Sequence, residues 1–256
     1  MPRTAREKSG TGIYHMILRG INRQTIFVDD EDAAKFIYTL IRYKEKSEFI
    51  LYAYCLMGNH VHMLVKEGRE DLSIVAKRIG ASYVYWYNMK YERCGHLFQD
   101  RYRSEIVEDD RYFLTVLRYI HQNPVQAGLV NEITSYPWSS YPEYLGKPRL
   151  IDINFVLEYF DDDKEKAIEK FKTFHEIKES VQCQEFDEKK KWKDSEAIEL
   201  IKNLCQVNQC TELQNLDRAK QYEYIKRLCF AGLSARQLSR ITGLGRWVIQ
   251  NAIENR

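Results

Sequence analysis

Apolar and polar residues follow a pattern that predicts four strands in the first half of the chain. Each stretch is short, contains β-branched or aromatic residues and is bounded by polar or turn-forming residues. The Gly58-Asn59 pair between the second and third stretches is a turn signal, so these two strands are expected to form a β-hairpin. The four predicted strands are residues 12–19, 49–57, 60–66 and 101–107.

Three further segments have features of helices, and together with the strands they predict the fold. The last of them is expected to end near Asn123, because Pro124 disfavours helical geometry in the residue before it. The order βαββαβα suits a split βαβ arrangement. We therefore expect an α+β domain with a ferredoxin-like or RRM-like antiparallel sheet and helices on one face. The predicted helices are residues 30–46, 71–91 and 111–121.

Proline-rich and charged segments indicate how the chain is divided. Residues 135–146 contain two prolines and several aromatic residues, which are expected to fasten the end of the first domain. We predict a catalytic domain over residues 1–147, a charged, solvated helical connector over 148–182 and a helical domain over 183–256. These three segments contain 20, 6 and 13 basic residues against 18, 9 and 10 acidic ones, so an acidic connector joins two mildly basic units.

Composition narrows the class of protein. Hydrophobic residues make up 44% and charged residues 30%, which is ordinary for a soluble globular protein and argues against extensive disorder. No run approaches the ~18 apolar residues of a membrane span, and no signal-peptide core is evident near Met1. We expect a cytoplasmic protein with no membrane partner.

The most suggestive chemistry lies in the third predicted strand. Side chains alternate between the faces of a strand, so His60 and His62 project to the same side. By itself this pair is a weak indication of a metal site, because such triplets occur by chance and most histidines are structural or exposed.

The last predicted helix carries Tyr119 and Asn123, which are four residues apart and therefore on one helix face. Two imidazoles and a carboxamide oxygen would make a three-ligand divalent site with open positions for a substrate phosphate. A tyrosine of pKa near 10 needs such a polarised electrophile to act as a nucleophile. The alternative is that Tyr119 is one core aromatic residue among 18 tyrosines and that Asn123 caps the helix.

Three motifs in order resemble the single-tyrosine HUH transposases, especially the REP-associated tyrosine transposase branch. They are Gly58-Asn59-His60-Val61-His62, the segment from Gln99 to Ser104, and the segment from Arg118 to Gly128. The resemblance covers about residues 10–145.

This resemblance implies a catalytic domain that binds Mg²⁺ or Mn²⁺ and cleaves single-stranded DNA through a 5′-phosphotyrosine, leaving a free 3′-OH. The implied metal ligands are His60, His62 and Asn123, and the implied nucleophile is Tyr119. The smallest family members have Gln four residues after the tyrosine, so the shorter Asn123 departs from their pattern. Some compact relatives are dimers, which leaves a monomer or a homodimer open for this chain.

Binding of single-stranded DNA requires cations along a groove, and several arginines surround the predicted site. Each could instead form a surface ion pair. The segment from Gly20 to Arg23 resembles a family loop near bound DNA. His15 could approach the site or make a core hydrogen bond, and we expect the second. The candidate DNA-binding arginines are Arg19, Arg23, Arg101, Arg103 and Arg118.

Residues 232–253 have the pattern of a helix-turn-helix, with Ser234 as an N-cap and a glycine turn between two apolar-periodic helices. In that motif the second helix enters the major groove of duplex DNA. The alternative is a helical bundle that packs on the catalytic domain. The candidate contact residues are Arg246, Trp247, Gln250 and Asn251.

Two functions follow. The first is a metal-dependent nickase and strand transferase that acts on hairpin-forming repeat DNA. The second is a non-catalytic, sequence-specific DNA-binding regulator with a vestigial HUH site, and RNA binding by an RRM-like sheet is a weaker third.

Overall fold

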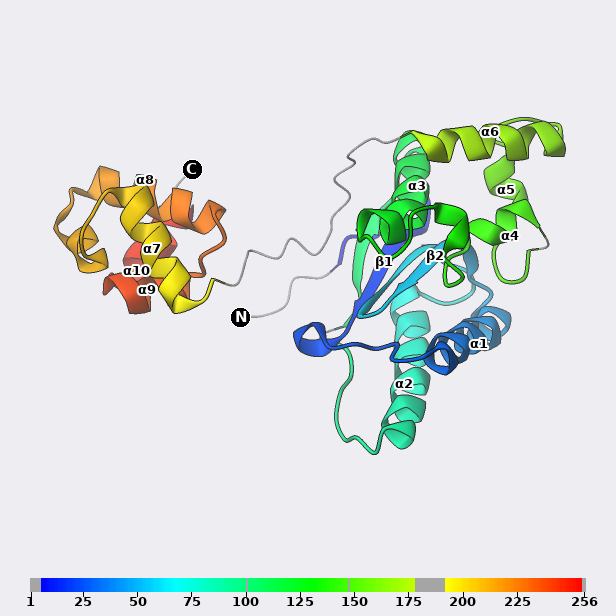
Figure 1. Ribbon diagram of the computed structural model, residues 1–256, viewed down its shortest axis with the longest axis horizontal. Coiled ribbons are helices and arrows are strands. Elements are labelled where there is room, and N and C mark those ends of the chain that lie inside the picture. The colour runs from blue at the N-terminus through cyan, green and yellow to red at the C-terminus, as the bar shows by residue number, and fades with distance from the viewer. Residues whose placement is uncertain (1–5, 100, 147, 178–191, 255–256) are drawn as a thin grey trace. The chain divides into compact units, whose positions relative to one another are not determined.

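The computed structural model describes residues 6–99, 101–146, 148–177 and 192–254 (Figure 1). The chain divides into two compact units, residues 1–183 and 184–256, each with its own hydrophobic core. The predicted boundary between residues 182 and 183 lies outside the described residues.

The first unit is built on a four-stranded antiparallel sheet with the strand order β2-β3-β1-β4. β1 and β2 run parallel with β3 between them, and β3 and β4 run parallel with β1 between them, so the chain forms two split βαβ units. The predicted α+β, ferredoxin-like class is confirmed. The strands are β1 (Ile13–Arg19), β2 (Ile50–Met57), β3 (His60–Lys66) and β4 (Arg103–Ile106).

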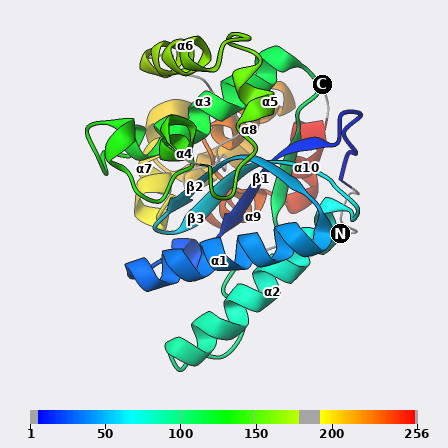
Figure 2. The same ribbon diagram turned by 90° about the vertical axis from the view of Figure 1, so that its right-hand side faces the viewer.

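Different helices cover the two faces of this sheet (Figure 2). α1 (Asp30–Ser47) and α2 (Leu72–Lys90) pack together on one face, as the prediction of one-sided helices requires. α3 (Asp110–Gln126) lies on the opposite face against β2 and β3, so the expectation of helices on one face alone is wrong for this helix. The physical reason is burial, since apolar side chains such as Leu64 project to that face and are fully covered.

α3 also continues beyond the end that the sequence indicates. It reaches Gln126 with Pro124 inside its last turn, where proline removes only one helical hydrogen bond. The turn is closed by bonds from Ala127 N to Asn123 O and from Leu129 N to Pro124 O, both 2.9 Å long. The expected helix end near Asn123 is therefore wrong, because a proline this close to the C-terminus is tolerated.

Two α2 tyrosines fasten the loop between β1 and α1. The Tyr83 hydroxyl donates to the carbonyl of Ile26 at 2.6 Å, and the Tyr87 hydroxyl donates to that of Thr25 at 3.1 Å. Ile26 N in turn donates to the carbonyl of Gly58 at 2.8 Å. The loop is thereby held against the turn that precedes His60.

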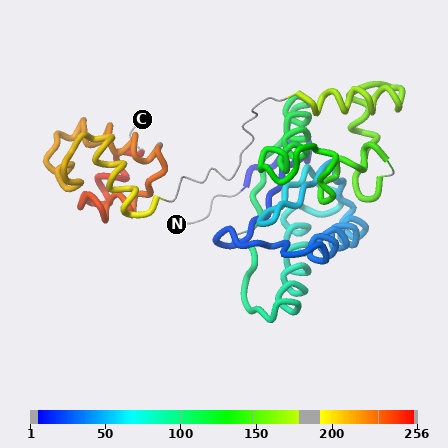
Figure 3. Tube along the Cα trace, viewed as in Figure 1, coloured from blue at the N-terminus to red at the C-terminus, as the bar shows by residue number. Residues whose placement is uncertain are grey.

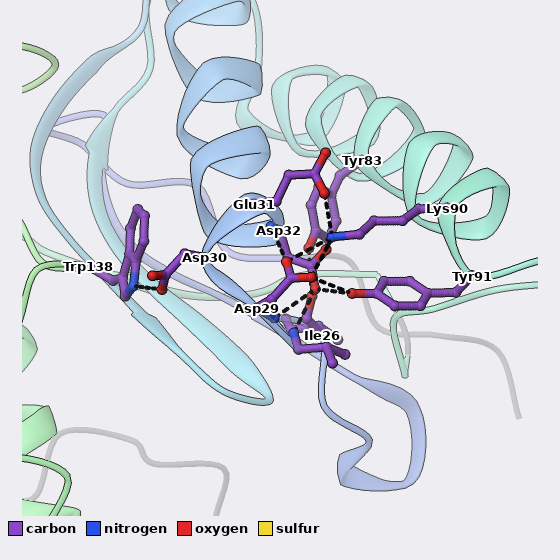
Figure 4. Close-up of polar contacts among 10 residues, drawn as sticks. Ile26, Asp29, Asp30, Glu31, Asp32, Tyr83, Lys90, Tyr91 and Trp138 are labelled. Atoms are coloured by element: carbon purple, nitrogen blue, oxygen red, sulfur yellow. Dashed lines mark hydrogen bonds and ion pairs between the residues drawn. The ribbon is translucent and has the colours of Figure 1, made fainter.

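A buried carboxylate holds the same loop at the start of α1 (Figure 4). Asp32 accepts hydrogen bonds from Val28 N at 2.6 Å and from the Tyr91 hydroxyl at 2.8 Å. Lys90 Nζ lies 2.9 Å from the Asp32 carboxylate and 2.8 Å from that of Asp29. This acidic cluster is compensated by Lys90 and is a structural clamp.

The chain stays with the first unit after α3, as its trace shows (Figure 3). Tyr144, Leu157 and Phe171 from the following helices join the same core as the sheet. The predicted domain end at residue 147 and the solvated connector are therefore not seen over residues 148–177. The reason is that α6 is charged on one side only, with Ala167 and Phe171 buried one turn apart. The added helices are α4 (Tyr141–Leu145), α5 (Asn154–Leu157) and α6 (Lys164–Glu176).

The second unit is helical, and its core includes Ile201, Leu228, Leu238 and Ile249. Three residues connect α9 to α10, and Gly243 adopts φ +73°, which lets α9 end in the left-handed conformation. No helix in the described part of the chain is long and apolar enough to cross a membrane. The helices are α7 (Asp194–Cys205), α8 (Arg218–Phe230), α9 (Ala235–Thr242) and α10 (Arg246–Glu254).

Candidate active site

Two histidines stand at the start of β3, directly after the Gly58-Asn59 turn. His60 and His62 alternate with the buried Val61 and so share the sheet face that α3 covers. Their ring centroids are 4.8 Å apart and their planes are inclined by 85°. The two imidazoles therefore form one cluster.

The surroundings keep both imidazoles neutral near neutral pH. Burial, assisted by the charge of Arg19, lowers the pKa of His60 from 6.5 to about 4. Burial also lowers the pKa of His62 well below 6.5, and the nearby His15, His60 and Arg19 act in the same direction. The neutral ring is the form of histidine that binds metal ions.

Each of these rings uses its Nδ1 atom for a contact within the protein. His60 Nδ1 lies 2.6 Å from Oδ1 of Asn59, and because a carboxamide oxygen only accepts, this nitrogen carries the proton. His62 Nδ1 lies 2.9 Å from Nε2 of His15. In His60 the lone pair is therefore on Nε2, with Nδ1 held by a neighbour, which is the usual arrangement of a metal-binding histidine.

α3 brings Tyr119 to this cluster. Its ring lies steeply inclined to those of His62 and His15, at centroid distances of 5.4 and 5.9 Å. Tyr119 is only 3% exposed, and Asn123, one turn further on the same helix face, is 8% exposed. The phenol and the histidines thus adjoin, while the carboxamide lies further along the same stripe of α3.

The ring nitrogens of His60 and His62 can hold a divalent cation only together with an uncharged oxygen ligand. Among the described residues, no group of three or more His, Cys, Asp or Glu side chains is arranged to hold a metal ion. The two histidine nitrogens would need a carboxamide or substrate oxygen to complete a site. Such a mixed set fits Mg²⁺ or Mn²⁺ only when phosphate and water oxygens fill the remaining positions.

Two of the predicted DNA-binding arginines lie on the histidine face. Arg19 is directly opposite His60 in the β1–β3 ladder, and its charge acts on the pKa of both His60 and His62. Arg103 is opposite Ile17 in the β1–β4 ladder, which puts it on the same face. These cations flank the cluster from neighbouring strands.

Two further arginines are exposed near the ends of strands. Arg23 is in the short helix η1 (Ile21–Arg23), and its carbonyl accepts a hydrogen bond from Asn59 Nδ2 at 3.3 Å. Arg101 is exposed two residues before β4 begins. Asn59 thus connects the Arg23 loop with His60.

Arg118 is placed differently from the other four. It is 5% exposed, and its guanidinium lies 4.6 Å from the centre of the Phe174 ring in α6. The predicted DNA contact does not fit this burial. Gln122 on the same helix donates to the carbonyls of His175 and Ile177 at 2.8 and 3.0 Å, so this side of α3 binds α6.

Two histidines given no role by the sequence form a second buried pair. His121 Nδ1 lies 2.9 Å from His175 Nε2, and His121 Nε2 lies 2.8 Å from the hydroxyl of Ser140. His175 Nδ1 lies 2.8 Å from the carbonyl of Phe171 and must donate to it. Neutral rings satisfy this whole chain, so the pair joins α3 to α6 and has no free nitrogen for a ligand.

In the second unit the four predicted contact residues lie on α10. Ile249 and Ala252 are buried, whereas Arg246 is exposed and Trp247 is 68% exposed. Gln250 and Asn251 are half-buried, one turn after Arg246 and Trp247 respectively. α10 thus presents a cationic and aromatic surface.

The first unit thus combines a split βαβ sheet with a histidine pair on one strand and a tyrosine on the covering helix. Residues 9–123 match the family model described as "Transposase IS200 like". This match covers less than half of the chain, and it shows that residues 9–123 are similar to that transposase family.

Two known proteins resemble it. The REP-associated tyrosine transposase of Escherichia coli K12 is 21% identical over 136 residues, which are 52% of this chain and 78% of that protein. A solved structure of a REP-associated tyrosine transposase bound to a REP hairpin matches with a TM-score of 0.51 and 18% identity, over 60% of this chain and 90% of that one. At this identity the second match bears on the fold alone.

His15 makes the expected core hydrogen bond and also lies at the site. It is fully buried, its Nε2 lies 2.9 Å from His62 Nδ1, and its ring contacts that of Tyr119. The available signal was the alternation along residues 13–19, which puts His15 on the same face as Arg19. Recognising its proximity to His62 also required the β1–β3 register, which no single strand reveals.

Proposed function

We propose that the first unit is a metal-dependent single-stranded DNA endonuclease and strand transferase that uses Tyr119 as its nucleophile. The observation that supports this most is the contact between the Tyr119 ring and His62 in a cluster of neutral imidazoles. The match of residues 9–123 to the transposase family supports the transposase class, and the tyrosine-histidine cluster supports the covalent mechanism.

In this mechanism the residues of the chain position a phosphodiester for in-line attack. His60, His62 and Asn123 would hold Mg²⁺ or Mn²⁺, which when bound withdraws electrons from a phosphate oxygen. The Tyr119 oxygen forms a bond to phosphorus, the bond from phosphorus to the 3′ oxygen breaks, and that oxygen gains a proton as the phenol loses one. The products are a 5′-phosphotyrosine and a free 3′-hydroxyl, and attack by a 3′-hydroxyl reverses the step.

Access to Tyr119 requires a local rearrangement. With 3% of its surface exposed, the side chain meets a phosphate only if neighbouring side chains move when DNA binds. Arg19 and Arg103, on the histidine face, are suited to neutralise the phosphates on either side of the scissile bond.

The proposed substrate is a hairpin-forming repeat strand. The similar solved structure contains a REP hairpin, and we extend that substrate class to this chain. Exposed arginines at positions 23 and 101 add charge near the ends of β1 and β4, where a single strand would pass.

The decisive test uses end-labelled single strands from the repeats that flank the gene of this protein, incubated with and without Mn²⁺. Wild type is expected to form a covalent adduct that survives denaturing electrophoresis, and Tyr119→Phe is expected to form none while binding the strand normally. Tyr112→Phe, on the same helix, is the matched control. An adduct that persists in Tyr119→Phe would reject the proposed nucleophile.

The second candidate function is DNA binding without catalysis. The burial of Tyr119 and His62 favours it, because both side chains also satisfy a purely structural role. In that case no flanking strand would give a metal-dependent adduct, and Tyr119→Phe would leave the biological activity unchanged.

We further propose that α9 and α10 act as a helix-turn-helix that binds duplex DNA. The exposed Arg246 and Trp247 on α10 support this proposal. The double variant R246A/W247A is expected to lower duplex affinity and to leave adduct formation on short single strands intact. Equal duplex affinity of this variant and wild type would favour a packing role for the second unit.

A further inference from the structure

Two side chains in line, a buried histidine and a partly buried glutamate, lead to His62 from the side away from His60. His15 on β1 is fully buried, with Nε2 2.9 Å from His62 Nδ1 and with the two ring planes inclined by 24° at a centroid distance of 5.2 Å. The other nitrogen of His15, Nδ1, lies 3.7 Å from Oε2 of Glu105 on β4. The β1–β4 ladder pairs His15 directly with Glu105, so the sheet itself aligns the three side chains.

The contact between the two rings requires a choice of tautomer. A neutral imidazole has one N–H and one lone pair, so only one of the two facing nitrogens can carry the proton. If His62 Nδ1 donates, His62 Nε2 keeps a lone pair that can bind a cation. If His15 Nε2 donates instead, His62 Nε2 carries the proton and cannot bind one.

Glu105 favours the first arrangement. An ionised carboxylate only accepts hydrogen bonds, so it stabilises a proton on His15 Nδ1, the atom that faces it. His15 Nε2 is then an acceptor, and His62 Nδ1 must donate to it. The opposite arrangement would set a buried lone pair of His15 against a negative charge.

A neighbouring side chain also fixes the tautomer of His60. The Asn59 carboxamide donates from Nδ2 to the carbonyl of Arg23, which turns its Oδ1 toward His60 Nδ1. Both histidines would then offer Nε2 to the same ligand. Two independent side chains that impose one tautomer argue against a coincidence of packing.

We propose that Glu105 and His15 are positioning residues that hold His62 in the tautomer whose Nε2 is free to bind a divalent cation. The inference rests on the proposed function in that the cation is the one assigned to His60 and His62. In this proposal neither residue is itself a ligand of the cation.

The first measurement reads the tautomer directly, in the metal-free full-length protein near neutral pH. Long-range ¹⁵N–¹H correlation spectra distinguish an N–H at Nδ1 from one at Nε2. Wild-type His62 is expected to be protonated at Nδ1, and His15→Leu and Glu105→Gln are expected to shift the population toward the Nε2-protonated form. A wild-type His62 protonated at Nε2, or a population unchanged in both variants, would overturn the inference.

The second measurement is Mn²⁺ binding by calorimetry. His15→Leu is expected to weaken binding by about 10- to 100-fold, the usual effect of removing a partner of a metal-binding histidine. His15→Gln retains an amide oxygen that accepts from His62 Nδ1, so its affinity should return to within a few-fold of wild type. Equal affinities of His15→Leu and wild type, or no recovery in a folded His15→Gln, would contradict the proposed role.

Two further variants distinguish failure of this inference from failure of the proposed function. His60→Ala tests the metal site itself, and His96→Leu, at an exposed histidine, controls for unspecific Mn²⁺ binding. If wild type binds no Mn²⁺, the metal-dependent function fails. The tautomer of His62 in the metal-free protein still decides whether Glu105 and His15 orient it.

Discussion

Replacing Phe171 by alanine tests whether α6 is a packed part of the first unit or a solvated connector. The Phe171 ring is fully buried, and its centroid lies 4.4 Å from that of Tyr144 and 4.2 Å from that of His175. Truncation of a buried phenylalanine costs about 3–5 kcal/mol, and the ring contacts argue for roughly 4 kcal/mol here. This loss is a large fraction of the free energy of unfolding of a typical domain, which is about 5–15 kcal/mol.

The assay must report on the first unit alone, because the second has a separate core. Hydrogen exchange of the central strands β2 and β3, followed by mass spectrometry, gives the opening free energy of that unit. Thr173→Ala, at an exposed position two residues further on α6, is the matched control and should change stability by less than about 0.5 kcal/mol. A change below about 1 kcal/mol for Phe171→Ala would refute the packed helix and favour a connector.

Three other perturbations probe the same unit. Asp32→Asn weakens the buried clamp of Figure 4 and should destabilise the unit by about 1–3 kcal/mol in hydrogen exchange, so an unchanged opening free energy would contradict its role. Gly20→Ala sets a Cβ 2.2 Å from the Gln24 carbonyl oxygen and should lower the free energy of unfolding by about 1–3 kcal/mol. Gly58→Ala is the control and should lower it less, because its Cβ would have nothing within 4 Å. Equal thermal midpoints of the two variants would reject this steric argument. Burial lowers the pKa of His175 from 6.5 to about 3, so between these pH values the unfolded chain binds a proton that the folded chain does not. The free energy of unfolding should therefore fall as the pH drops below about 6.5. Urea midpoints that stay constant down to about pH 4.5 would contradict this.

The parts of the fold that follow from local pattern could be predicted from the sequence. Strand alternation and the Gly58-Asn59 turn fix the β2–β3 hairpin, and the order of elements fixes the sheet topology. The acidic start of α1 was also visible, and Asp29 and Asp32 form a reciprocal capping box there.

The parts that depend on long-range packing could not be predicted. The charged residues of 161–170 suggested a solvated helix, because its buried side is narrow and its partners, including Tyr144 and His121, are distant in sequence. The same holds at the site. The spacing of His60 and His62 is local, whereas the approach of His15 depends on the pairing of β1 with β3.

α3 connects the site with α6, because two adjacent rows of its side chains make different contacts. Tyr119 and Asn123 belong to the stripe toward the sheet, while Arg118 and Gln122 belong to an adjacent stripe that binds α6 through Phe174 and the carbonyl of His175. The family match ends at residue 123, so α6 lies entirely beyond it. Because α3 is held between the sheet and α6, the position of the Tyr119 hydroxyl depends on contacts outside the matched segment. A chain truncated after α3 would therefore retain every proposed site residue of the first unit and still lack the support that fixes Tyr119, the proposed nucleophile.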